Sequence, residues 1–165
     1  MKIERRMMPA EALTKTRAGS TRTIEGIAVP YRSLSVILRD RPRAYREKIE
    51  PRAMQIDDSV SMFIQHNPGG VPLARTGAGT LRFEERENGL GFECDLPDCR
   101  QDVIEALERG DFDGSVSVGF IVAEDGDTWQ HRRSGPSVRT VRAARLVELS
   151  LVTSGAYASA SSRLT

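Results

Sequence analysis

The chain has 165 residues, of which 39% are hydrophobic and 28% are charged, and its net charge is +1. This composition is typical of one soluble globular domain, and it excludes a low-complexity chain and a bulk nucleic-acid binder. No apolar run approaches the roughly 20 residues that a membrane span needs, and the N-terminus lacks the apolar stretch of a signal peptide, so we expect neither membrane insertion nor secretion.

Charge is unevenly placed along the chain. Basic residues outnumber acidic ones in residues 1–50, whereas acidic residues dominate residues 84–113. Neither residues 1–20 nor residues 158–165 show hydrophobic periodicity. We therefore predict a basic, flexible leader over 1–20, a folded domain over 21–157 and a flexible tail over 158–165. A solvated leader is favoured over one that contacts nucleic acid or an acidic partner.

Short alternating apolar runs, broken by Gly, Pro, Asp or Asn, dominate the rest of the chain and predict strands. The predicted strands are Thr23–Pro30, Leu34–Leu38, Tyr45–Ile49, Val60–Ile64, Thr80–Glu85, Gly91–Leu96, Ser115–Ala123, Thr128–Arg132, Ser137–Arg142 and Arg145–Val152. Residues 80–96 form a predicted hairpin whose turn, Glu87–Gly89, would use positive φ angles.

One helix is predicted after residue 97. Asp98 would cap it, Val103, Ile104 and Leu107 would form its apolar stripe, and Gly110 would end it. A second, shorter helix would start within Pro51–Met54. The predicted fold class is therefore mainly β with one or two helices (α+β), arranged as a barrel or a sandwich.

The chain has only two histidines. His66 stands at the end of an apolar strand, just before a Pro–Gly–Gly turn, where an imidazole can face a cleft. Its ordinary pKa of about 6.5 suits a general base, although a surface histidine beside a turn would fit the same pattern. His131 lies in a polar, basic stretch and is expected to be solvated.

The stretch DFDGSVSVGFIVAE predicts a strand with two serines on one face. The period of two places Ser115 and Ser117 on one side and Val116 and Val118 on the other. A serine on a rigid strand near a histidine is a candidate nucleophile. The alternative is a pair of serines on the solvated face of a strand.

A third candidate lies in RLVELSLVTSGAY. Val147, Leu149 and Leu151 would face the core, which leaves Glu148 and Ser150 on the opposite face. If Glu148 faces a cleft, it would orient the imidazole as the acidic member of a triad does. An outward-facing glutamate without a function fits the spacing equally well.

Other chemistries lack their sequence patterns. The chain contains no phosphate-binding Gly-rich loop with Lys-Ser/Thr, no HExxH helix and no GxSxG elbow. Cys94 and Cys99 form neither a disulfide framework nor a zinc site, which fits a reducing cytosol. A cysteine nucleophile stays open as an alternative, but neither cysteine has a basic neighbour expected to activate it. We expect no metal and no cofactor.

Five segments, taken in order over residues 23–158, resemble the caudovirus prohead protease family. They are IEGIAVPYRSLS with YREKIEPRAM, FIQHNPGGVPLART, TGAGTLRFEERENGLGFECDLPD, the Arg109–Asp111 turn with SVSVGF, and VELSLVTSGAY. Each motif is weak alone, but the order of all five is specific.

This resemblance implies a herpesvirus-protease-like fold, which is an antiparallel β-barrel flanked by helices. It also implies a serine protease with His66 as general base, Ser117 as nucleophile and Glu148 as the acidic residue. Its substrates would be the scaffolding region of the major capsid protein, or a separate scaffold, and the protease itself. The protease is expected to be a homo-oligomer. The implied location is inside immature phage capsids in the bacterial cytoplasm.

The sequence departs from the family pattern at several positions. Ser115 stands where the family usually has Gly, and alignment on Gly119–Phe120 places the nucleophile at Ser117. Other departures are Arg52, Asn67, Ala74, Leu151, Ser154 and Gly155, none of which removes a proposed catalytic group. Backbone N–H groups of Arg139–Arg145 are candidates for the oxyanion hole.

Two functions follow from the sequence. The leading hypothesis is a serine endopeptidase of phage capsid maturation. The alternative is a catalytically inactive capsid-assembly or scaffold-binding protein with the same fold, which would bind through the basic leader or an open strand edge. The two differ in geometry, because only the protease needs His66 within reach of Ser117.

Overall fold

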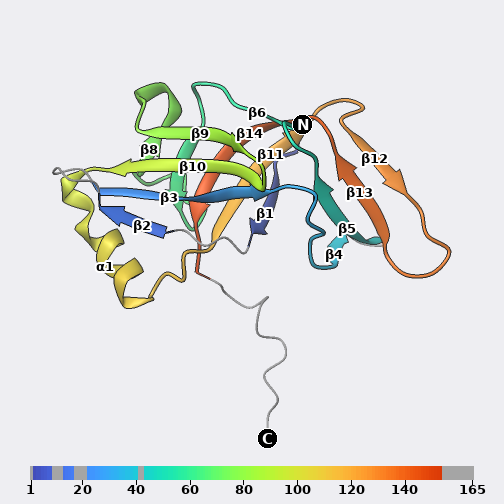
Figure 1. Cartoon of the computed structure of the whole chain (residues 1–165), viewed down its shortest axis with the longest axis horizontal. Coiled ribbons are helices and arrows are strands. Elements are labelled where there is room, and N and C mark those ends of the chain that lie inside the picture. The colour runs from blue at the N-terminus through green and yellow to red at the C-terminus, as the bar shows by residue number, and fades with distance from the viewer. Residues whose placement is uncertain (1, 9–12, 17–21, 41–42, 154–165) are drawn as a thin grey trace, which may run out of the picture.

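The computed structural model describes residues 2–8, 13–16, 22–40 and 43–153. Within these residues the strands form three sheets that pack around one hydrophobic core (Figure 1). The predicted tail over 158–165 lies outside the described residues.

The largest sheet contains the strands that carry the candidate site. Its order is β1 (Glu4–Met8), β11 (Val116–Val122), β14 (Ala144–Leu151), β7 (Ser61–Ile64) and β8 (Ala74–Arg75), and β6 (Met54–Gln55) also pairs with β14. β11 runs antiparallel to both β1 and β14, whereas β6 and β7 run parallel to β14. The two central strands, β11 and β14, are therefore paired on both sides and buried along most of their length.

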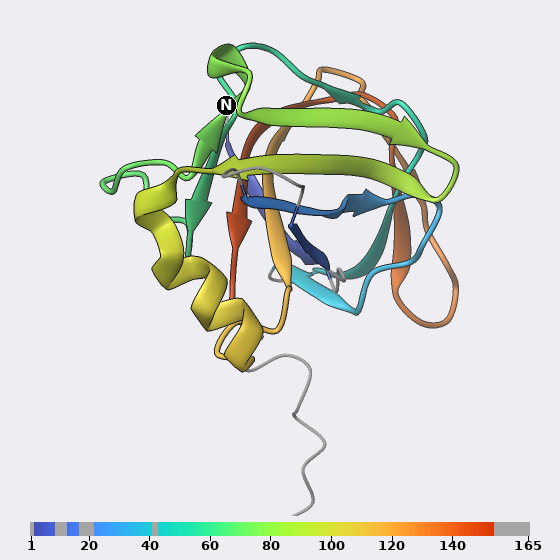
Figure 2. The ribbon, with the colours of Figure 1, turned by 60° about the vertical axis from the view of Figure 1, so that its left-hand side comes forward.

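The second sheet crosses in front of β11 and β14 in Figures 1 and 2. It is antiparallel throughout, with the order β2 (Leu13–Thr16), β3 (Arg22–Pro30), β10 (Gly89–Leu96) and β9 (Leu81–Arg86). Ile24 and Phe92 from this sheet and Val118 and Phe120 from β11 all belong to the fully buried core. Burial of such side chains contributes about 1.5–3 kcal/mol each, so this contact between sheets supplies much of the driving force for folding.

The predicted hairpin is confirmed, but its turn has a different geometry. Gly89 pairs with Arg86, so only Glu87 and Asn88 lie between the strands, and none of these residues has a positive φ. Gly89 is needed for space instead, because a Cβ there would lie 2.5 Å from the carbonyl oxygen of Val29.

The third sheet has the order β4 (Leu38–Asp40), β5 (Arg43–Ile49), β13 (Ser137–Val141) and β12 (Asp127–Gln130). β13 runs parallel to β5 and antiparallel to β12. The predicted strand over residues 34–38 is wrong except at its last residue, since β4 starts at Leu38. Leu34, Val36 and Ile37 are exposed large hydrophobic residues in the preceding loop.

The predicted helix is α1 (Gln101–Arg109), the only α-helix in the described part of the chain. Val103 and Ile104 are buried, and Gly110 ends the helix in the left-handed conformation with φ 80, both as predicted. The predicted cap is wrong: Asp98 begins a short 3-10 helix (Asp98–Arg100), and Arg100 precedes α1 without capping it through its side chain. A 3-10 helix over Thr76–Ala78 leads into β9.

The second predicted helix is absent. Pro51 and Arg52 form a turn, in which Arg52 has φ 61, and Met54 begins β6. A left-handed residue interrupts helical geometry at that point, so the chain enters the large sheet instead.

The mainly β fold class is confirmed, with one helix. The herpesvirus-protease-like barrel is not confirmed, because the described strands form three sheets and no closed barrel. Among the described residues, no helix has both the length and the apolarity that a bilayer crossing requires.

The start of the chain also differs from the prediction. Part of the predicted leader, Glu4–Met8, is strand β1, and another part, Leu13–Thr16, is strand β2. β1 is the edge strand next to β11, so it lies directly beside the predicted nucleophile. The domain boundaries at residues 21 and 157 stay a prediction.

Candidate active site

Strand β11 presents Ser117 on the face of the sheet that points away from the core. Val116 and Val118 are both fully buried in the core, as predicted, so Ser117 lies on the other face. Its neighbours in register are Met7 on β1 and Ser150 on β14. Ser117 is only 3% exposed, and Ser150 is fully buried with no hydrogen-bond partner for its hydroxyl.

Glu148 on β14 lies on the same face, directly beside a β-bulge. Gly119 pairs with Glu148 and the next residue, Phe120, pairs with Leu146, so Val147 is the extra residue on β14. The prediction that Val147 faces the core is therefore wrong: Leu146 is fully buried and Val147 is only half-buried. A bulge re-aims side chains locally, and here it re-aims Val147, whereas Glu148 stays opposite Gly119 in the regular register of the strand.

Gly119 provides the space that the carboxylate occupies. A Cβ on Gly119 would lie 2.6 Å from Cγ of Glu148 and 2.9 Å from its Oε1. Any larger residue at this position would therefore displace the Glu148 side chain. Glu148 is 5% exposed, which makes it one of the few buried acidic side chains of the described residues.

His66 lies just beyond the end of β7, where the sequence predicted it. Gln65 and His66 have φ angles of 52 and 55, which are uncommon for residues with a Cβ. The turn is held by a hydrogen bond from the Gln65 N–H to the Leu151 carbonyl (2.8 Å). Two successive left-handed residues reverse the chain there, and the imidazole returns over the sheet.

The structure brings His66 and Glu148 into contact. Nδ1 of His66 lies 2.8 Å from Oε1 of Glu148. Because an ionised carboxylate only accepts hydrogen bonds, Nδ1 carries the proton, and Nε2 of the neutral ring is then the acceptor. This is the orientation that a histidine base needs, with the acidic partner behind it.

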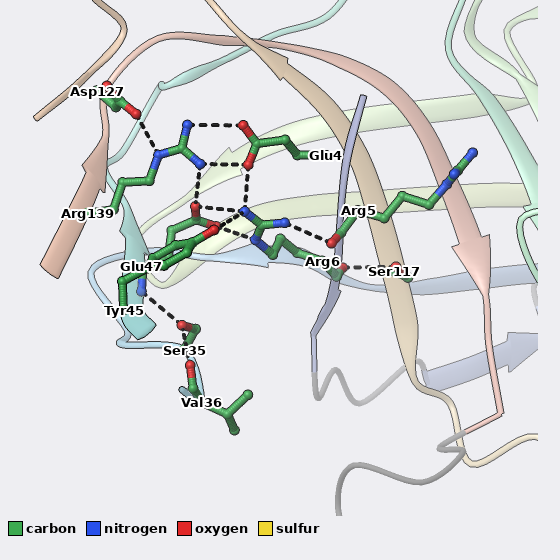
Figure 3. Close-up of polar contacts among 10 residues, drawn as sticks. All are labelled: Glu4, Arg5, Arg6, Ser35, Val36, Tyr45, Glu47, Ser117, Asp127 and Arg139. Carbon is green, nitrogen blue, oxygen red and sulfur yellow. Dashed lines mark hydrogen bonds and ion pairs between the residues drawn. The ribbon is translucent and has the colours of Figure 1, made fainter. Parts of the chain in front are cut away.

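The third predicted residue, Ser117, makes a different hydrogen bond. Its hydroxyl donates to the carbonyl oxygen of Arg6 on β1 at 3.0 Å, as Figure 3 shows. A serine hydroxyl has one proton, so in this conformation the proton is directed to β1 rather than to His66. Ser115, the other candidate, precedes β11, and its backbone N–H donates to the Asp113 carboxylate (2.9 Å).

Strand β1 is held in place by buried ion pairs on its other side. Arg139 on β13 forms a two-pronged contact with Glu4 (2.6 and 3.0 Å) and also contacts Glu47 on β5 (3.0 Å). Arg6 contacts the same two carboxylates, with its Nε 2.7 Å from Glu47. Figure 3 shows this ion-pair network, which consists of Glu4, Arg6, Tyr45, Glu47, Asp127 and Arg139.

The network predicts how stability depends on pH. Burial alone would raise the pKa of Glu4, but hydrogen bonds and charges of Arg139 and Arg6 outweigh it and lower that pKa below its ordinary 4.5. A lowered folded-state pKa stabilises the fold fully above about 4.5, and this contribution is lost as the pH falls through the folded-state value. We expect Glu4→Gln to lose stability at pH 7 and to approach the wild type near pH 3. Urea unfolding of both proteins across this range measures the difference, and a gap that does not narrow on acidification would contradict the assignment.

Several of the backbone N–H groups proposed for the oxyanion hole make hydrogen bonds elsewhere in the fold. Arg139 lies in the ion-pair network on β13. The N–H groups of Arg142 and Ala143 donate to the carbonyl of Gly126, and that of Ala144 donates to the carbonyl of Ala53. These three donors are thus already used within the fold.

The remaining candidates lie apart from the site. His131, predicted to be solvated, is exposed beside β12, where it stacks on Trp129 and lies 3.3 Å from the Ser137 hydroxyl. Cys94 is fully buried on β10, and burial raises the pKa of its thiol to about 12, so it is inert as a nucleophile. Cys99 is exposed on the short 3-10 helix. Among the described residues, no three His, Cys, Asp or Glu side chains gather as a metal site would require.

Two residues at the site were missed from the sequence, namely Arg5 and Arg6. Arg5 contacts Glu148 through its Nε (2.7 Å), and Arg6 supplies the carbonyl that accepts from Ser117. Both stand in ERRMM, which gives no alternating pattern. The one available signal was the concentration of basic residues near the start of the chain.

The comparison with known proteins agrees with this chemistry. The family model of the caudovirus prohead serine protease matches residues 10–165, which is most of the chain. No curated protein and no solved structure matches it significantly. The match includes His66, Ser117 and Glu148, and it confirms the resemblance found in the five ordered motifs. The chain therefore belongs to the caudovirus prohead serine protease family.

Proposed function

We propose that this protein is a serine endopeptidase that uses Ser117, His66 and Glu148 to cleave capsid or scaffold polypeptides during phage capsid maturation. The observation that carries the proposal is the 2.8 Å contact between His66 and Glu148 on the face of the sheet that also presents Ser117. Family membership supports the serine peptidase class and the link to proheads.

In the proposed reaction, Oγ of Ser117 attacks the scissile carbonyl carbon while Nε2 of His66 takes the hydroxyl proton. His66 then gives this proton to the leaving amine, and an acyl-enzyme remains on Ser117. A water molecule, activated by His66 in the same way, releases the second product. Glu148 accepts the hydrogen bond from Nδ1 and stabilises the imidazolium that forms in each half of the reaction.

The proposed reaction requires a rearrangement at Ser117. In the proposed reaction its hydroxyl leaves the Arg6 carbonyl and donates to Nε2 of His66. Hydrogen bonds between catalytic groups are often loose without substrate and tighten in the complex. The observed bond to Arg6 therefore describes a resting arrangement.

The proposed substrates are the scaffolding segment of the major capsid protein, or a separate scaffold, and the protease itself. The proposed place of action is the interior of the immature capsid in the bacterial cytoplasm. Both proposals rest on the family and on its link to proheads. Enclosure with the substrate would give a high local concentration, so that a protease without tight substrate binding still cleaves efficiently.

The test mixes the purified protein with its capsid precursor, with and without prior treatment by an organophosphorus serine reagent. Intact mass spectrometry follows both chains. We expect discrete truncation of the precursor only in the untreated sample, and one added phosphonyl group on the treated protease.

The other outcomes show which part of the proposed function is wrong. Truncation that persists after complete labelling would exclude a serine nucleophile. Absence of both truncation and labelling, with capsid shells still forming, would overturn the protease and favour the catalytically inactive assembly protein.

A further inference from the structure

A second group besides His66 contacts the proposed acidic residue. Nε of Arg5 lies 2.7 Å from Oε1 of Glu148, and Nδ1 of His66 lies 2.8 Å from the same oxygen. The Glu148 side chain is 6% exposed, whereas that of Arg5 is 48% exposed. One carboxylate oxygen therefore contacts a half-exposed cation, Arg5, and the proposed base, His66.

The register of the sheet explains how Arg5 reaches this carboxylate. Arg5 on β1 pairs with Gly119 on β11, and Gly119 in turn pairs with Glu148 on β14. Arg5 and Glu148 are thus on opposite sides of a single residue that has no side chain. Because Gly119 leaves its face of β11 open, the guanidinium extends across the strand to the carboxylate.

The chemistry of the contact concerns the charge of Glu148. Burial disfavours an ionised carboxylate, and a neutral imidazole compensates for this only as a hydrogen-bond donor. Arg5 is the cation that the structure places on the buried carboxylate. The permanently charged guanidinium donates a charge-assisted hydrogen bond to Oε1 and fixes this oxygen, so that it accepts the Nδ1–H of His66.

We propose that Arg5 is a positioning residue of the active site, acting on His66 through Glu148. This inference rests on the proposed protease function. It assigns a catalytic consequence to β1, and it explains why the edge strand belongs to the site. Arg5 does not contact the scissile bond in this scheme.

The experiment measures cleavage of the capsid precursor by the full-length chain. Arg5→Met removes the charge while retaining an unbranched side chain, and Arg5→Lys retains the charge. We expect Arg5→Met to lower kcat about ten- to hundredfold with little change in KM, as loss of a hydrogen bond to a charged group does. Arg5→Lys should recover most of the loss. Arg46→Met, at an exposed arginine of β5, is the matched control and should behave like the wild type.

A double-mutant cycle separates positioning from a structural role. In a Glu148→Gln background, Arg5→Met should cause no further loss, because the group through which it acts is already gone. The Tm of Arg5→Met should stay within a few degrees of the wild type, because the Arg5 side chain is half-exposed and ion pairs open to solvent contribute little to stability.

Three results would overturn the inference. They are full activity of Arg5→Met, an equal loss in the Glu148→Gln background, and failure of Arg5→Lys to recover activity together with a large fall in Tm. The proposed function fails in a different way, when Ser117→Ala cleaves as well as the wild type. An inactive Ser117→Ala beside a fully active Arg5→Met would refute the role of Arg5 alone.

Discussion

Replacement of Ser117 by alanine is expected to lower kcat by about a millionfold, the loss seen when a serine protease loses its nucleophile. The variant lacks the attacking oxygen. The residue that pairs with Ser117 on β14 is Ser150, whose hydroxyl is fully buried. Stability should change little, because the variant loses one hydrogen bond to a backbone carbonyl, worth about 1 kcal/mol. Single-turnover cleavage of the capsid precursor measures the rate, and thermal unfolding checks the fold.

Ser115→Ala is the matched control, since it makes the same exchange two residues earlier. Ser115 contacts the Asp113 turn through its backbone, which the exchange leaves intact. We expect activity close to that of the wild type, and peptide mapping of the labelled wild type should place the phosphonyl group on Ser117. If Ser115→Ala is the inactive variant, the register of the nucleophile has been assigned wrongly by two residues.

The sequence allowed this register to be predicted because β11 obeys simple alternation. Val116 and Val118 are apolar and fully buried, and Ser117 between them takes the opposite face. The end of β7 before His66 was equally predictable, since an apolar run is followed by a Pro–Gly–Gly turn. Where local pattern and tertiary position agree, the positions of the candidate residues on their strands could be predicted.

The pattern on β14 was less informative. Strict alternation would bury Val147, but the bulge opposite Gly119 and Phe120 shifts the burial to Leu146. Glu148 still lies on the predicted face, because Leu149 and Leu151 beyond the bulge alternate normally. A bulge depends on the pairing with the neighbouring strand, so one sequence does not reveal it.

Strand β1 could not be predicted for a related reason. Its residues ERRMM carry three charges in succession, a composition that is typical of solvated segments. The strand exists because Glu4 and Arg6 find partners on β5 and β13, far away in the sequence. These long-range ion pairs also explain why a segment without an apolar stripe occupies the edge of the largest sheet, beside Ser117. Pairing across more than a hundred residues leaves no local signal.

Loss of Arg139 should therefore destabilise the protein strongly. Its side chain is 8% exposed and contacts Glu4, Glu47 and Asp127, and the Glu47 side chain is only 2% exposed. Removing one partner of a buried ion pair leaves the other charge poorly compensated, at a cost of about 3–5 kcal/mol. For a chain of this size we expect Arg139→Met to lower Tm by about 6–20 °C. Arg142 is an exposed arginine directly after β13, and Arg142→Met should leave Tm nearly unchanged.

The same variant tests whether β1 couples the network to the active site. Glu4 and Arg6 fix the strand on one side, while Arg5 and the Arg6 carbonyl reach Glu148 and Ser117 on the other. If β1 transmits this anchoring, Arg139→Met should lose activity at temperatures where circular dichroism shows it to be fully folded. Full activity of the folded variant would mean that pairing with β11 alone holds β1 in place. A Tm equal to that of Arg142→Met would show instead that the ion pairs only balance their own cost of desolvation, and that the buried network contributes no net stability.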